Sequence, residues 1–257
     1  MMDAIKTKSL WTEVLPHAEK LLQHVRDHMP KEGFDQRYPN VQIVGMFWHA
    51  LRLYDGVLVL LKAELPEEAA ILARSLFETS MRLRQLQAEP HDRTALILRW
   101  LNNALAHQLG VLEVMKECAL GIDIEGKVAM LKEQRKQIRK SVSELGLRRS
   151  KPFLDIKDAA FKFDRKADYF YYEWAHESVH GTDAGWMFAK KRATAEWVGF
   201  CGKTDEPMLL TGLAHFATRS MVDATMGVFT ILGWALPTGL DQTVNKIKQC
   251  IDTHSAE

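Results

Sequence analysis

Groups able to move protons or to hold a metal ion gather in one stretch of the chain, residues 164–181, with the sequence DRKADYFYYEWAHESVHG. The apolar period of this stretch predicts a helix over 165–181. Residues spaced by four lie on one side of a helix, so Tyr172, His176 and His180 share a stripe. We therefore expect the chemistry of the protein, if it has any, to be organised around this helix.

One chemistry that the stretch permits is zinc hydrolysis, because HESVH at 176–180 matches the H-E-x-x-H pattern of zinc peptidases. In that pattern two imidazoles one turn apart bind the metal and the glutamate deprotonates a bound water molecule. His176 and His180 are then metal ligands, Glu177 is the base, and Glu196 is the candidate third ligand. Zinc is the cofactor under this hypothesis alone, and the other hypotheses need no cofactor.

A second helix, predicted over 66–88, offers partners for the first. Arg74 and Glu78 are four residues apart, and this spacing allows an ion pair on one helix face. Two interpretations stay open. The pair either belongs to a solvated face, or it turns inward toward the helix that carries His180.

The same two helices carry a family resemblance. ARSLFETSMRLRQL at 73–86 and YYEWAHESVHG at 171–181 resemble a group of uncharacterised bacterial all-helical proteins. Those proteins have an Arg-x-Leu-hydrophobic-Glu helix and a later Tyr-x3-Ser-x3-His-Gly helix, whose serine is replaced here by His176. The group is similar, more distantly, to the HEPN superfamily of helical nucleotide- and RNA-binding domains, many of which are metal-independent ribonucleases of bacterial defence and toxin systems.

The resemblance implies RNA or a nucleotide as the partner, and a homodimer as one arrangement of the chain. Under this hypothesis His180 is a general acid or base, Arg74 neutralises charge on a phosphate, and Glu78 or Tyr172 orients them. No HEPN active-site pair is carried over, because the Arg-x4–6-His signature of that superfamily is absent from any predicted helix. A third hypothesis is a non-catalytic helical module in which the same four side chains form a buried network.

Positive charge gathers on the helix predicted over 123–145. Its apolar seam leaves a row of cations on another face, namely Lys132, Arg135, Lys136 and Arg139. Clustered cations release condensed counterions when they bind phosphates, so this row is the candidate substrate-binding surface for RNA or a nucleotide. A face that is merely solvated is the alternative.

The rest of the chain predicts an all-α protein. Of its 257 residues 47% are hydrophobic, and nearly every segment repeats with the helical period. We expect a single helical bundle of about eight helices in one domain, 1–257, with a less regular segment at 182–206. The predicted helices span 9–29, 40–63, 66–88, 92–119, 123–145, 165–181, 207–235 and 240–254. The helix at 40–63 is apolar nearly all round, which favours a place at the centre, with buried partners for His49 and Asp55.

Composition limits the partners and the compartment. The net charge of +1 provides no overall field that would attract nucleic acid or an anionic membrane, so any anionic partner must bind a local patch. The first residues lack the apolar core of a secretory signal, and the three cysteines form no C-x-x-C pair. The most apolar window, Met221–Leu236, is shorter than the ~20 residues of a membrane span. These features predict a cytoplasmic protein with no membrane partner.

Overall fold

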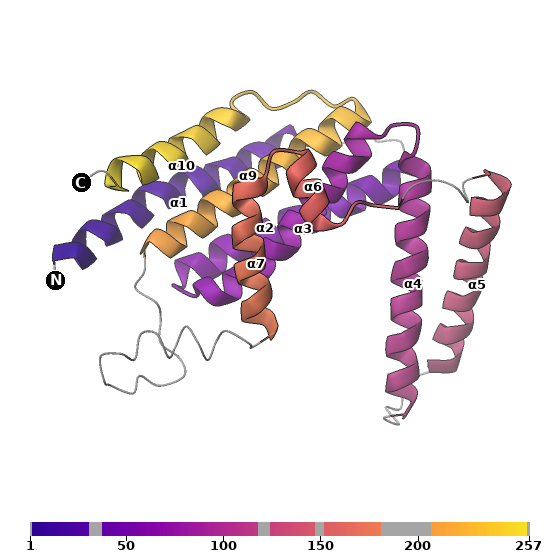
Figure 1. Cartoon of the computed structure of the whole chain (residues 1–257). Coiled ribbons are helices and arrows are strands. Elements are labelled where there is room, and N and C mark those ends of the chain that lie inside the picture. The colour runs from indigo at the N-terminus through magenta and orange to yellow at the C-terminus, as the bar shows by residue number, and fades with distance from the viewer. Residues whose placement is uncertain (1, 31–37, 118–123, 147–151, 181–206, 256–257) are drawn as a thin grey trace. The chain divides into compact units, whose positions relative to one another are not determined.

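The chain is all-α, as the sequence predicts. The computed structural model describes residues 2–30, 38–117, 124–146, 152–180 and 207–255, and this part contains nine helices and no strand (Figure 1). The helices are α1 (Met2–His28), α2 (Asn40–Lys62), α3 (Pro66–Ala88), α4 (Arg93–Glu117), α5 (Ile124–Glu144), α6 (Ile156–Lys162), α7 (Lys166–His180), α9 (Pro207–Leu232) and α10 (Leu240–Ser255). Every predicted helix is present, and α6 is one that the sequence analysis missed.

The chain divides into two compact units. The first comprises residues 1–87 and 155–257, and the second comprises residues 88–154. Whether they fold as the single domain expected from the sequence stays a prediction. Each unit is described below by itself.

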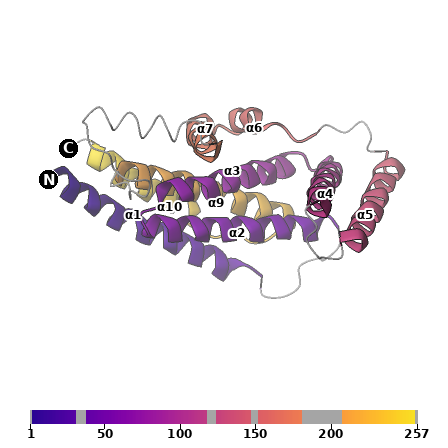
Figure 2. The ribbon, with the colours of Figure 1, turned by 90° about the horizontal axis from the view of Figure 1, so that it is seen from below.

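Helix α9 forms the centre of the first unit. It packs against α1, α2, α7 and α10, and most of its side chains from Leu210 to Phe229 are buried (Figure 2). The Tyr54 hydroxyl of α2 donates to the Ala18 carbonyl of α1 at 3.0 Å and lies 3.0 Å from Thr218 Oγ1 of α9. Gly227 of α9 lets α3 approach closely, since an added Cβ atom would lie 3.2 Å from the Leu83 backbone.

The central place predicted for α2 is wrong. Trp48 and Val59 of this helix are 51% and 59% exposed, and His49 is exposed as well. Asp55 is half-buried and forms an ion pair of 3.0 Å with Arg26 of α1. A nearly continuous apolar sequence therefore does not require burial all round, because folded proteins leave much apolar surface in water.

By length and composition alone, α2 is also the one helix in the described residues that could cross a membrane, and half of its most apolar window is buried within the protein. Core helices of globular proteins commonly meet the same criterion. The absence of a membrane partner and the cytoplasmic location stay predictions.

The short helix α6 turns the chain into α7. Asp155 caps its start by accepting a hydrogen bond from the Asp158 backbone N–H at 3.0 Å. At its end the Arg165 N–H bonds the Ala160 carbonyl while Asp164 takes a left-handed φ of 56°, which is the Schellman pattern. Asp164 is thus the residue that ends α6. The turn directs Arg165 toward α9.

The second unit is a hairpin of α4 and α5, which run antiparallel and side by side (Figure 1). Leu109 of α4 and Ile124 and Leu131 of α5 are buried in it. The predicted apolar seam of α5 is confirmed at Leu131, and the cations next to it stay outside the core.

Candidate functional site

In the first unit, Arg74 and Glu78 of α3 face Tyr172 of α7. The Tyr172 hydroxyl donates to Glu78 Oε1 at 3.1 Å, and Arg74 Nη2 donates to the Tyr172 hydroxyl at 3.4 Å. Arg74 Nε lies 3.5 Å from the same carboxylate oxygen, and its guanidinium carbon lies 5.0 Å from the centre of the Tyr172 ring. Of the two interpretations left open by the sequence, the structure confirms the pair turned inward.

The charges of this cluster are balanced within it. Burial raises the pKa of Tyr172, which keeps its hydroxyl protonated and able to donate to Glu78. The other Glu78 oxygen lies 3.8 Å from Arg82 Nη2. Each charged group of the cluster has an opposite charge beside it. The hydrogen bonds of Tyr172 to Arg74 and Glu78 therefore join α7 to α3 without any bound ion or ligand.

The histidines of the central motif are placed only by their backbone. α7 extends through His180, but the side chains of His176, Glu177 and His180 lie outside the described residues, as does Glu196. His180 follows Tyr172 by eight residues, a rise of about 12 Å along a helix. The contact of His180 with Arg74 and the zinc site stay predictions. In the described part of the chain, no three His, Cys, Asp or Glu side chains are grouped so as to hold a metal ion.

A second polar cluster, which the sequence analysis missed, lies where α7 begins against α9. Arg165 and Asp168 are each 4% exposed, and Arg165 Nε donates to Asp168 Oδ2 at 2.5 Å. Arg165 also pairs with Asp223, and Arg219 Nη1 lies 2.9 Å from Asp168 Oδ2. These four side chains form the arginine–aspartate network of the first unit.

Burial lowers the pKa of His215, which lies beside this network. His215 lies one helical turn before Arg219 in α9, and its buried Nε2 has no hydrogen-bond partner. Burial, helped by repulsion from Arg219 and Arg165 and opposed by attraction to Asp168, lowers the pKa of His215 to about 4. The imidazole is therefore neutral at physiological pH.

Part of this network was visible in the sequence. His215, Arg219 and Asp223 follow one another at spacings of four, which places them on one stripe of α9. Their partners Arg165 and Asp168 lie some fifty residues earlier, and no local pattern links the two segments.

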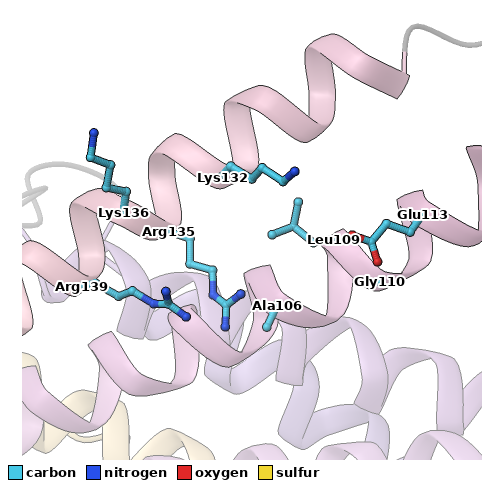
Figure 3. Close-up of a pocket in the computed structure, with 8 residues that line it drawn as sticks. All are labelled: Ala106, Leu109, Gly110, Glu113, Lys132, Arg135, Lys136 and Arg139. Atoms are coloured by element: carbon cyan, nitrogen blue, oxygen red, sulfur yellow. The ribbon is translucent and has the colours of Figure 1, made fainter.

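In the second unit, the predicted basic row lines a groove of about 410 Å³ between α4 and α5. All four cations contribute to it, together with Ala106, Leu109, Gly110 and Glu113 of α4. Figure 3 shows the guanidinium groups of Arg135 and Arg139 reaching across toward Ala106, while the Lys136 ammonium points away. Arg135 Nε donates to Asn102 at 3.2 Å, which holds this side chain over α4.

Comparison with known proteins places the chain in a family. The pattern of a family described as Family of unknown function (DUF5677) matches residues 41–190, which is more than half of the chain. The chain belongs to the DUF5677 family. No curated protein and no solved structure matches it.

The matched segment contains both motifs that suggested the resemblance, at 73–86 and 171–181, so the expected membership of an uncharacterised family is confirmed. In this DUF5677 member the segment runs from α2 through α7, and it therefore includes the Arg74–Glu78–Tyr172 cluster and the whole α4–α5 groove.

Proposed function

We propose that this DUF5677 member binds RNA, holding its phosphates in the α4–α5 groove. The observation that carries the proposal is the pair of guanidinium groups, Arg135 and Arg139, that face into a groove of about 410 Å³. Guanidinium forks match phosphate oxygens with two parallel hydrogen bonds. The HEPN-like resemblance supports RNA as the polyanion. It also supports a bacterial defence or stress system as the setting in which this protein acts.

Local charge supports the same proposal. The whole chain has a net charge of only +1, yet four of the eight residues that line the groove are cations and one is an acid. Within the part of the chain that the structure describes, the side chains of Lys132 and Arg139 form no ion pair or hydrogen bond. Cations that have no ion pair within the protein can neutralise phosphates, and the counterions condensed on the nucleic acid are then released.

The test is fluorescence anisotropy with a labelled single-stranded oligoribonucleotide at several salt concentrations. Arg139→Gln should weaken binding and reduce the slope of log K against log salt by about 0.7, the contribution of one phosphate contact. Lys140→Gln is the matched control, because Lys140 is on the same helix, pairs with Glu144 and does not line the groove. Equal losses in the two variants would reject the groove as the binding surface.

A second variant blocks the groove without removing charge. Gly110 lies in the groove wall, and an added Cβ atom there meets no atom within 4 Å. Gly110→Phe should therefore fold normally and exclude RNA. Gly45 on the exposed side of α2 has the same open surroundings, and Gly45→Phe should leave RNA binding unchanged.

The second candidate function is a non-catalytic helical module. It is favoured by the mutual pairing of Arg74, Glu78 and Tyr172, which joins α3 to α7 through two hydrogen bonds and includes one ion pair within α3. Under this hypothesis, substitutions in the cluster lower the melting temperature, and the wild-type protein binds no RNA at the α4–α5 groove.

A further inference from the structure

The two guanidinium groups and the carboxylate of the α4–α5 groove are separated along its length. Arg135 and Arg139 reach the end marked by Ala106, whereas Glu113 lies at the other end (Figure 3). Ala106 and Glu113 are seven residues apart on α4, which corresponds to about 10 Å of helix. A bound molecule therefore meets two guanidinium groups at one end and a carboxylate at the other, with the Lys132 ammonium of α5 between them.

On the α4 side, the stretch between these two ends is apolar. Leu109 is 7% exposed and forms the floor of the groove, with Gly110 beside it. Glycine lowers the stability of a helix interior. At position 110 it has a compensating effect, because the missing side chain leaves open space above the floor of the groove. A flat, apolar group fits this middle section.

A nucleotide with an amino-bearing base has the complementary order of groups. Its phosphate is an anion, the face of its base is flat and apolar, and the exocyclic amine at the far edge donates hydrogen bonds. A carboxylate accepts such bonds, as acidic side chains do from the N4 amine of cytosine. Uracil presents carbonyl oxygens on both sides of its N–H group, and these oxygens repel a carboxylate.

We propose that the groove selects RNA bases that carry an exocyclic amino group over uracil, and that Glu113 is the residue that makes this distinction. The phosphate lies against Arg135 and Arg139, the base lies on Leu109, and the amine donates to the Glu113 carboxylate. Single-stranded RNA is the form recognised, because its base edges are free to be read. This inference rests on the proposed RNA binding.

The test compares labelled oligo(C) with oligo(U) of equal length at one fixed salt concentration. These strands share a backbone and differ only in the edge of the base. Wild-type protein should bind oligo(C) at least about fivefold more tightly, which is the low end for one well-formed base-edge contact. Glu113→Gln should bring the ratio of the two affinities close to one, because an amide both accepts from cytosine and donates to uracil.

Glu144→Gln is the matched control, since it removes the same charge from an exposed residue of α5 outside the groove, and it should preserve the ratio. Equal affinities of wild-type protein for the two strands, or a ratio unchanged in Glu113→Gln, would overturn the inference. If those results came with weaker binding of both strands by Arg139→Gln, RNA binding itself would stand. If neither strand bound to wild-type protein, both proposals would fail.

Discussion

The Tyr172 hydroxyl of α7 donates a hydrogen bond to the Glu78 carboxylate of α3 across 3.1 Å. These residues lie 94 positions apart in the chain, so the bond joins two segments that only the fold brings together. It is half-buried, and hydrogen bonds to charged groups contribute more to stability than neutral ones.

We expect Tyr172→Phe to lower the free energy of unfolding by about 1 to 2 kcal/mol, because it leaves the Glu78 carboxylate without this donor. Urea denaturation followed by circular dichroism measures the change. Tyr169→Phe is the control on the same helix, since Tyr169 bonds Glu173 near the surface, and its effect should be smaller. Equal effects of the two substitutions would argue against a stabilising role of the Tyr172–Glu78 bond.

The stability of the protein should fall as the pH drops from about 6.5 to about 4. His215 has a folded pKa of about 4, below its ordinary value of 6.5, because burial opposes its charged form. Between these values the unfolded chain binds the proton and the folded chain does not, so protonation favours unfolding. Above pH 6.5 the imidazole is neutral in both states and has no such effect.

Melting temperatures at a series of pH values, measured for the wild type and for His215→Gln, test this expectation. The variant should show a shallower loss of stability below pH 6.5, because glutamine does not titrate. Carboxylates titrate in both proteins, so the difference between the two curves isolates the imidazole. Identical curves would mean that His215 does not contribute.

Arg165→Met should be strongly destabilising, by about 3 to 5 kcal/mol, because it removes the buried cation that pairs with the buried Asp168 and the partly buried Asp223. Arg26→Met is the comparison. It breaks the ion pair with Asp55, whose partners are 43% and 48% exposed, and should change stability by less than about 1 kcal/mol. Similar losses from the two substitutions would contradict the buried character of the arginine–aspartate network.

Asp164→Gly should stabilise the protein by about 0.5 to 1 kcal/mol. Asp164 holds a left-handed φ of 56° after α6, and glycine takes this conformation without steric conflict between Cβ and the backbone. The gain is limited because glycine also increases the entropy of the unfolded chain. A lower melting temperature in the variant would show that the Asp164 side chain itself stabilises the turn.

The catalytic hypotheses make opposite predictions about metal. Metal-independent RNA cleavage should continue in EDTA and disappear in His180→Ala, whereas a zinc hydrolase should contain about one zinc ion per chain and lose its activity in EDTA. Elemental analysis and an RNA cleavage assay distinguish them. Protein that cleaves no RNA and takes up no zinc would support the helical module.

The interior of the first unit shows where prediction from sequence reached its limit. Periodicity located α2 and α9 correctly, but both are strongly apolar, and only packing shows that α9 is central while α2 exposes Trp48 and Val59. The helix α6 was missed because its seven residues make too few turns to display a period.

Local spacing determined much of the candidate sites. The Arg74–Glu78 pair and the basic row of α5 were predicted because residues three and four apart are neighbours on any helix. The tertiary structure alone decided that Tyr172 completes the first group, that Arg165 joins Asp168 to Asp223, and that Glu113 stands across from the cations. These relationships join different helices, and a helical period carries information about one helix at a time.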